Sequence, residues 1–237
     1  TQAATSSGTA TFSDDTFSYG SYNLVVTATD PAGLTDVDQI NFTVNGVPSA
    51  PVVNLTPVSP TTTDVLMVSL VTPSIDPEGT MPTYTYEWQL AGQVQSTYTS
   101  NSLPNSATQK GEQWTVVVTP NDGLTDGISA QSNTVSIVNT PPVLTSVVVT
   151  PDPAIAGIDD LTCDVTATDV DGDPIVYTYE WSDSNGVQQV MIEVSDVSDV
   201  FLTGGLGEDT WTCDVTPYDG TDYGVSNAAS VAVESGC

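Results

Sequence analysis

The sequence YTYEW, at residues 84–88, returns unchanged at residues 177–181. Each copy is followed by a second tryptophan segment, WTVVVTPNDG at residues 114–123 and WTCDVTPYDG at residues 211–220. The first tryptophans lie 181 − 88 = 93 residues apart, and the second pair lies 211 − 114 = 97 residues apart. A repeat of this length, written in alternating positions, is typical of tandem β-sandwich domains and not of a solenoid of small repeats.

The composition also indicates an all-β chain. Its 237 residues suffice for about two to three small sandwiches, each burying its own core. Valine, threonine, tyrosine and serine dominate between glycine, proline and Asp-Gly turn signals, and helix signals are almost absent. We therefore expect tandem immunoglobulin-like β-sandwiches, of which the N-terminal one is incomplete.

The charge balance excludes several classes of partner. The chain has 30 acidic residues, one lysine (Lys110), no arginine and no histidine, for a formal net charge of −29. Such a surface repels nucleic-acid phosphates and anionic lipid headgroups, so neither nucleic-acid binding nor electrostatic membrane docking is expected. The sequence contains no run of about 18 apolar residues, so membrane insertion is not predicted. The charge fits solubility in a salt-rich medium, with a specific cationic partner as the alternative.

Two short proline joints divide the chain, PSAP at residues 48–51 and NTPP at residues 139–142. Proline fixes its own φ and biases its predecessor toward extended backbone, so such joints act as semi-rigid spacers. We expect three domains, at residues 1–49, 50–140 and 141–237, arranged head to tail as a rod.

Residues 1–49 resemble the C-terminal half of such a sandwich. YNLVVT at residues 22–27 fits the slot of the second tryptophan segments, with Tyr22, Leu24 and Val26 on one face, and no counterpart of YTYEW precedes it. Half a sandwich leaves an apolar face and an unpaired edge in water. Three explanations are open: the chain is a piece of a longer protein, another chain completes the domain by strand donation, or the segment is a small self-sufficient sheet.

Alternation places Cys163 and Cys213 on the inward faces of strands that oppose each other across an immunoglobulin-type sandwich. The second domain has Val68 and Val116 at these positions, so both cysteines are replaced together. We expect an inter-sheet disulfide, with two buried thiols as the alternative. A stable disulfide implies an oxidising, extracytoplasmic setting. Cys237 has no expected partner within the chain. It is a free thiol, part of an intermolecular disulfide, or the end of an excised segment.

The chain resembles the bacterial and archaeal immunoglobulin-like tandem repeats of the PKD and cadherin-like superfamily. The resemblance spans essentially the whole chain and rests on ATDVDGD at residues 167–173, on the Tyr-x-Tyr-x-Trp strand, on Val-Thr-Pro-x-Asp-Gly and on Asn-x-Pro-Pro at a boundary. It implies a secreted or surface-anchored protein, and therefore an extracellular or cell-surface location. It does not specify function, because such modules serve as spacers, adhesive units or appendages to enzymes.

The best candidate metal site is DVDGD at residues 169–173. Asp169, Asp171 and Asp173 alternate around a glycine turn and can present several hard oxygens to one Ca²⁺, a ligand set that does not suit transition metals. The counterpart at residues 76–80 retains two acids, Asp76 and Glu78. The alternative is an Asp/Gly-rich turn held by side chain to backbone hydrogen bonds. Calcium is the one cofactor that the sequence suggests.

Two further patterns concern the surface. Asn41 and Asn54 begin N-glycosylation tripeptides, although this pattern also arises by chance in chains rich in asparagine and threonine. The tryptophans and the tyrosines of YTYEW could form a sugar-stacking platform, but their matched positions on inner strands favour core packing.

Catalysis has little support. Without histidine, a Ser–His or Cys–His pair cannot form within this chain, and no substrate cleft is evident around the scattered carboxylates. We expect a non-enzyme: an extracellular structural or adhesive rod, as a subunit or segment of a surface filament or sheath. The competing function is a passive spacer, or a carbohydrate- or ligand-binding accessory module, of a larger adhesin or secreted enzyme. The expected partners are other copies of the chain or neighbouring domains of the same large protein.

Overall fold

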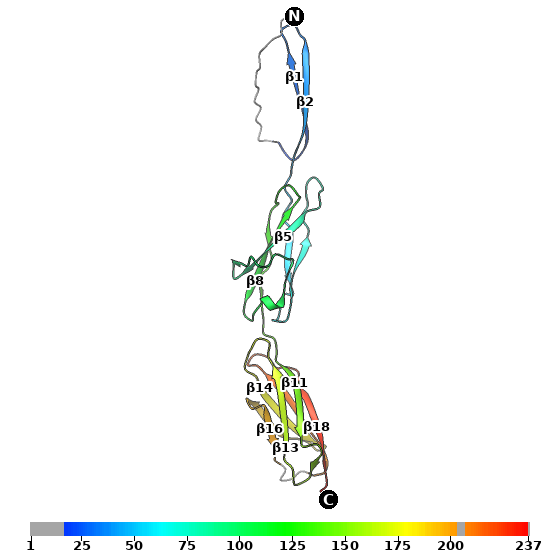
Figure 1. The fold of residues 1–237 in the computed structure, drawn as a ribbon, viewed down its shortest axis with the longest axis vertical. Coiled ribbons are helices and arrows are strands. Elements are labelled where there is room, and N and C mark those ends of the chain that lie inside the picture. Colours follow the sequence, from blue (N-terminus) through cyan, green and yellow to red (C-terminus); the bar gives the residue numbers. More distant parts are fainter. Residues whose placement is uncertain (1–16, 203–206, 237) are drawn as a thin grey trace.

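The computed structural model describes residues 17–202 and 207–236, so Cys237 lies outside the described residues. Figure 1 shows a hairpin and two sandwiches strung end to end along the longest axis of the molecule. Apart from a three-residue 3₁₀ turn at Asn105–Ala107, the regular structure in the described part is β-strand. No helix among the described residues has the length and apolar character needed to cross a membrane.

The first unit is a two-stranded antiparallel hairpin. Strand β1 (Gly20–Thr29) pairs with β2 (Thr35–Val44) along its full length. Tyr22 lies opposite Phe42 and Leu24 lies opposite Ile40, and directly opposed residues share one face. The ring of Phe17 packs edge-on against the rings of Tyr22 and Phe42, with centroids 4.7 and 5.4 Å away. This covers one end of the apolar face.

The rest of that face is open to solvent. Leu24, Val26 and Ile40 expose 36%, 55% and 59% of their surface. Among the described residues, β1 pairs only with β2, and no strand of the YTYEW type lies beside it. The uncovered apolar side chains among the described residues are consistent with half a sandwich, and the interpretation of this segment stays a prediction.

The two sandwiches share the order of their main strands, and the third unit has one additional short edge strand, Ala154–Ile155. In the second unit one sheet has the order β3-β4-β7, and the other has the order β10-β8-β5-β6 with β9 also on β8. The bounds are β3 Val52–Thr56, β4 Leu66–Thr72, β5 Thr83–Leu90, β6 Gln93–Val94, β7 Ser102–Leu103, β8 Gln113–Asn121, β9 Ala130–Gln131 and β10 Val135–Ser136.

In the third unit one sheet has the order β11-β13-β16, and the other has the order β12-β18-β17-β14-β15. The bounds are β11 Val143–Thr150, β12 Ala154–Ile155, β13 Leu161–Thr168, β14 Val176–Asp183, β15 Gly186–Val194, β16 Ser198–Phe201, β17 Asp209–Tyr218 and β18 Asn227–Glu234. The chain is thus all-β, with tandem immunoglobulin-like sandwiches after an incomplete first unit.

The repeated tryptophan segments form the two cores. YTYEW lies on β5 and β14, and each copy pairs antiparallel with the strand that carries the next tryptophan, β8 or β17. Trp88, Trp114 and Trp181 are fully buried or nearly so, and Trp211 is 5% exposed. The sequence pattern therefore predicted core positions correctly, and these rings do not form a surface platform.

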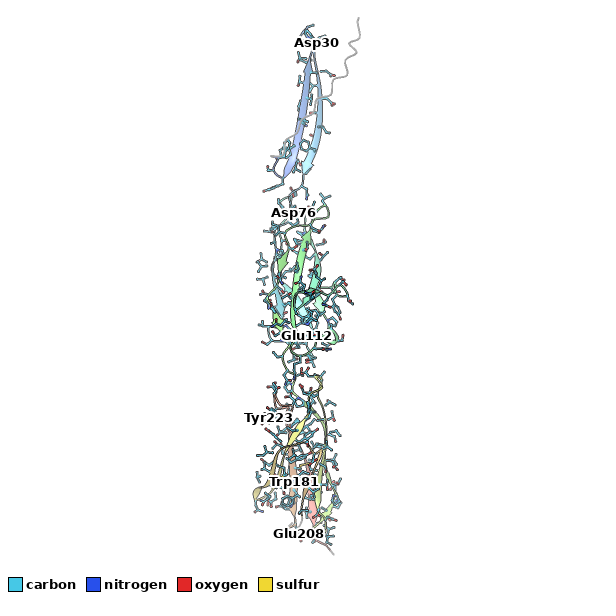
Figure 2. The ribbon with its side chains drawn as sticks, turned by 90° about the vertical axis from the view of Figure 1, so that its left-hand side faces the viewer. Asp30, Asp76, Glu112, Trp181, Glu208 and Tyr223 are labelled. Atoms are coloured by element: carbon cyan, nitrogen blue, oxygen red, sulfur yellow. A yellow bond between two sulfur atoms is a disulfide. The ribbon has the colours of Figure 1, made fainter. Side chains whose placement is uncertain are left out.

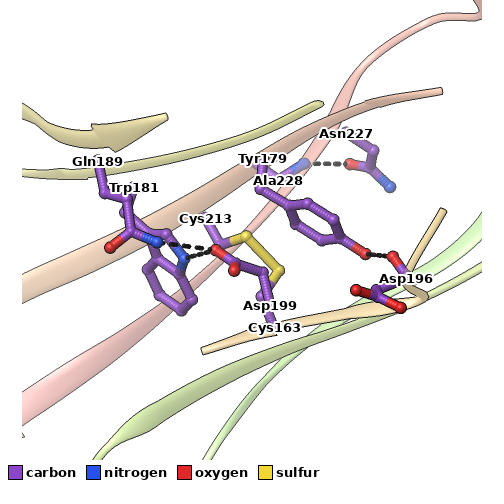
Figure 3. The surroundings of a disulfide bond; sticks show 9 residues. All are labelled: Cys163, Tyr179, Trp181, Gln189, Asp196, Asp199, Cys213, Asn227 and Ala228. Atoms are coloured by element: carbon purple, nitrogen blue, oxygen red, sulfur yellow. Dashed lines mark hydrogen bonds between the residues drawn. A yellow bond between two sulfur atoms is a disulfide. The ribbon is translucent and has the colours of Figure 1, made fainter. Parts of the chain in front are cut away.

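The disulfide is present. Cys163 on β13 and Cys213 on β17 are bonded across the two sheets, and both are fully buried (Figure 3). Beside them, Trp181 donates its ring N–H to the Asp199 carboxylate at 2.9 Å, and Tyr179 donates its hydroxyl to the Asp196 carbonyl at 2.8 Å. Burial raises the pKa of the Tyr179 hydroxyl above its ordinary value.

Candidate functional sites at the domain joints

At each joint, an asparagine just ahead of the linker prolines forms a hydrogen bond to the next unit. The Nδ2 of Asn45 donates to Asp122 Oδ2 at 2.8 Å and to Thr125 Oγ1 at 3.0 Å. The Nδ2 of Asn139 donates to Asp219 Oδ2 at 2.8 Å. Each asparagine ends one unit and each aspartate belongs to the next, so the same amide–carboxylate bond connects neighbouring units at both joints. Figure 2 shows the matching poles, marked by Asp76 on the second unit and Tyr223 on the third.

The middle acid of each predicted calcium motif holds the linker backbone. Glu78 Oε1 accepts the N–H of Gly46 at 3.0 Å, and Asp171 Oδ2 accepts the N–H of Thr140 at 2.7 Å. The other oxygen of Asp171 accepts the hydroxyl of Thr62, which belongs to the preceding sandwich. Asp171 and Glu78 therefore bind the backbone of the linkers between units.

The first acid of each motif organises its own loop. Asp169 Oδ1 accepts the N–H groups of Asp171 at 2.8 Å and Asp173 at 3.2 Å, and Asp76 Oδ2 accepts the N–H of Thr80 at 2.8 Å. This is the hydrogen-bonded turn considered as the alternative to a metal site. However, the second oxygen of each acid, Asp169 Oδ2 and Asp76 Oδ1, is buried and accepts no hydrogen bond from the described residues.

The structure adds a residue that sequence reasoning missed. Asp219, which follows β17, brings a carboxylate oxygen within 4.8 Å of oxygens from Asp169 and Asp173, whereas Asp171 is not part of this group. Asp219 is 6% exposed. The available signal was the Pro-x-Asp-Gly that ends both second tryptophan segments, because the loops that follow β13 and β17 meet at one pole of the sandwich.

Lys110 crosses the second joint. Its Nζ forms an ion pair with Asp173 and donates to Asn139 Oδ1 at 3.0 Å. The hydrogen bond to Asp173 raises the pKa of the Lys110 ammonium. The single basic side chain of the sequence therefore lies beside the three clustered aspartates of the following sandwich.

The joint asparagines also affect carboxyl pKa values. The hydrogen bond from Asn45, with the N–H groups of Thr125 and Leu124, lowers the pKa of Asp122 from 3.8 to about 2. For Asp219, burial opposes ionisation, but the Asn139 amide and nearby backbone N–H groups outweigh it and hold its pKa below the ordinary value.

A glycine lets the linker approach each sandwich closely. A Cβ on Gly127 would lie 2.4 Å from the carbonyl oxygen of Pro48, and one on Gly224 would lie 2.0 Å from that of Pro142. The same Pro48 oxygen accepts the N–H of Ile128 at 3.1 Å. Only glycine permits this backbone contact at either joint.

The remaining candidate residues lie on the surface. Asn41 on β2 accepts a hydrogen bond from Asn23 at 2.6 Å, and Asn54 on β3 is exposed, so glycosylation of both stays a prediction. A hollow of about 500 Å³ is lined by residues 140–144 and 223–227, none of which is acidic or basic. Tyr223 is the one titratable side chain among its lining residues.

Among solved structures, the chain is similar to the FN1–FN3 domains of chicken CNTN1, with 14% identity, 87% of this chain and 76% of that chain covered, and a TM-score of 0.32. It is also similar to a two-domain fibronectin type III segment of chicken tenascin, with 11% identity, 77% and 99% covered, and a TM-score of 0.40. No family model and no curated protein sequence matches the chain. The fold assignment rests on the strand order and the buried core described above.

Proposed function

We propose that this chain is part of an extracellular structural or adhesive rod of the PKD and cadherin-like type, without catalytic activity. The observation that carries the proposal is the repetition of one joint design at two places. At each joint an asparagine amide and a linker N–H of one unit bind two carboxylates of the next. A joint that serves only as a tether needs no such bonds.

The linker backbone is held as well. At the first joint, Ser49 N–H donates to the Ile75 carbonyl at 2.9 Å, and Ile75 N–H donates to Ser49 Oγ at 2.9 Å. Because these backbone groups are paired, the orientation of the units is set by hydrogen bonds and not by free rotation. The disulfide suits an oxidising environment outside the cytoplasm. Together these features favour a role in which length and stiffness matter.

Small-angle X-ray scattering of the full chain tests this role. The wild type should scatter as a rod, and the double variant Asn45→Ala, Asn139→Ala should show a broader distribution of interatomic distances with a smaller mean extension. Asn54→Ala, a change of the same kind on an exposed strand position, should match the wild type. A wild type already as flexible as the joint variant would contradict a stiff rod and support the passive spacer.

The open hairpin favours a second, compatible function in assembly. In the third unit, β17 pairs with β18 on one edge and with the YTYEW strand β14 on the other, and a second sheet covers its apolar face. Among the strands that the structure describes, β1 pairs with β2 alone. We propose that β1 receives an alternating aromatic strand of the β14 type from an adjacent module, antiparallel and in the register seen for β14 and β17.

A peptide with the sequence of residues 176–183 tests the proposed occupant. In NMR spectra of the full chain it should shift the amide signals of β1, and a scrambled peptide should not. Leu24→Asp, on the open apolar face, should abolish binding, whereas Val25→Asp on the opposite face should not. Equal shifts with both peptides would contradict the proposal. A concentration-dependent dimer that Leu24→Asp abolishes would instead identify a second copy of the hairpin as the occupant.

A further inference from the structure

The first joint contains an Asn-Gly dipeptide in which each residue has a structural reason. Asn45 donates its side-chain amide to Asp122 of the second unit. Gly46 is buried, and a Cβ at this position would lie 2.8 Å from Pro77 Cγ and 3.0 Å from Tyr19 Cβ. The joint therefore combines an amide at one position with the absence of a side chain at the next. In this combination the backbone nitrogen after the asparagine is unhindered, so it can attack the side-chain amide within the same chain.

A carboxylate is hydrogen-bonded to that nitrogen. Glu78 Oε1 accepts the N–H of Gly46 at 3.0 Å. A peptide nitrogen is a poor nucleophile while its lone pair is delocalised into the peptide bond, and it becomes a good one when a base removes its proton. The Asn45 side chain lies close to the same residue, because its Nδ2 also donates to the Gly46 carbonyl at 3.1 Å. The electrophile, the nucleophile and a base are therefore neighbours.

We propose that Asn45 is a site of spontaneous deamidation, with Glu78 as the general base. The Gly46 nitrogen gives its proton to Glu78 and forms a bond to Cγ of Asn45. The bond from Cγ to Nδ2 then breaks, and Nδ2 keeps the electron pair, takes the proton from Glu78 and leaves as ammonia. The five-membered succinimide that remains is opened by one solvent water at either carbonyl. The products are an aspartate or an isoaspartate at position 45.

The product reverses the electrostatics of the joint. The intact Asn45 amide donates to Asp122 Oδ2 at 2.8 Å and to Thr125 Oγ1 at 3.0 Å. A carboxylate at position 45 cannot donate these bonds, and it adds a negative charge beside the ionised Asp122. Like charges this close repel each other, so the modification should loosen the connection between the hairpin and the second unit. The change is irreversible, because ammonia is lost.

The second joint has the corresponding hydrogen bonds but a different residue at the attacking position. Asp171 accepts the N–H that follows the joint asparagine, at 2.7 Å. That N–H belongs to Thr140, whose branched side chain crowds the nitrogen and hinders its approach to Asn139. Deamidation should therefore act on the first joint and spare the second. This chemistry depends on Asn45, Gly46 and Glu78, so its test is separate from the test of a rod-like role.

Mass spectrometry of chymotryptic fragments tests the site in the full chain after incubation at neutral pH over several weeks. The Asn185–Gly186 dipeptide is the internal comparison, because it is exposed and no carboxylate accepts the Gly186 N–H among the described residues. Asn45 should convert on the order of tenfold faster than Asn185, a modest effect for a general base. Asn139 should stay intact.

Two variants separate the base from a general effect of charge. Glu78→Gln retains an oxygen acceptor but is a far weaker base, so it should slow the conversion of Asn45 on the order of tenfold and leave Asn185 unchanged. Asp126→Asn removes an exposed carboxylate from the loop after β8 and should change neither rate by more than about twofold. Asn45→Asp, which installs the product, should broaden the distance distribution in small-angle scattering, whereas Asn185→Asp should not.

Three results would overturn the proposal. The first is an Asn45 that persists while Asn185 is converted, which needs no variant and is decisive even if Glu78→Gln disturbs folding. The second is faster conversion of Asn45 in Glu78→Gln, because the hydrogen bond would then protect the dipeptide. The third is equal slowing by Glu78→Gln and Asp126→Asn, which would show an effect of net charge and not of a base.

Discussion

At the scale of single residues, each joint depends on an amide donor that meets an ionised carboxylate. Asn45 and Asn139 occupy equivalent places, and so do Asp122 and Asp219. The interaction requires the charged form of the acid, because a hydrogen bond from an amide to a carboxylate is stronger than one to a protonated carboxyl. Joint geometry is therefore linked to pH.

The first prediction concerns this linkage. The pKa of Asp122 falls from 3.8 to about 2 in the folded chain, so its contribution to the joint is complete above pH 4 and is lost as the pH falls toward 2. Asn45→Ala should raise this pKa toward the ordinary value, measured from the carbon-13 shift of the Asp122 carboxyl group. Asn54→Ala should have no effect. An unchanged midpoint in Asn45→Ala would contradict the assigned cause.

The second prediction concerns Gly224. Its substitution by alanine would place a Cβ 2.0 Å from the Pro142 carbonyl oxygen, so either the linker or the loop must move. We expect Gly224→Ala to lower the free energy of unfolding of the third sandwich by about 1–3 kcal/mol in urea denaturation. Gly207→Ala is the control, because nothing lies within 4 Å of its added Cβ. Similar losses in the two variants would refute the close-contact argument.

The sequence indicates which carboxylates are neighbours within one loop, but not which carboxylates from different loops lie close together. Asp169 and Asp173 are four residues apart, so one turn motif predicts that they are neighbours. Asp219 joins them only because strands β13 and β17 run to the same pole, and Asn139 only because the preceding unit ends there. Asp171 was grouped with its neighbours by spacing, but its side chain serves the joint.

At the scale of strands, alternation carried most of the predictive power. The inward positions of β13 and β17 were correct because both strands have one buried and one wetter face, and this fixed the disulfide. Short strands such as β12, β16 and the separated β9 and β10 left no comparable signal. Two to four residues cannot display a period, and their positions depend on which longer strand they lie beside.

The third prediction uses the two sandwiches as an internal comparison. Closing the 50-residue separation between Cys163 and Cys213 stabilises the third unit by about 4 kcal/mol in the chain-entropy model. Reductant should therefore lower the melting temperature of the third unit and leave that of the second unit unchanged, because Val116 replaces a cysteine there. Differential scanning calorimetry should resolve the two transitions. A parallel shift of both would show that the units unfold together.

At the scale of the whole molecule, the rod can be tested by whether one sandwich protects its neighbour from protease cleavage. Lys110 is the single basic residue of the chain, so trypsin has one site, and cleavage gives residues 1–110 and 111–237. Two interactions restrict access of trypsin to this site. Gly111 N–H donates to the Ile137 carbonyl at 2.8 Å within the second sandwich, and the lysine side chain pairs with Asp173 of the third.

The fourth prediction follows from the second of these contacts. Asp173→Asn should speed trypsin cleavage roughly twofold to fivefold, because the lysine side chain is released while the local backbone bond remains. The effect should be modest, since both side chains are partly exposed. Asp196→Asn should be cut at the wild-type rate. If all three proteins are cut equally fast, the neighbouring sandwich does not shield the site, and the second joint opens more readily than its hydrogen bonds imply.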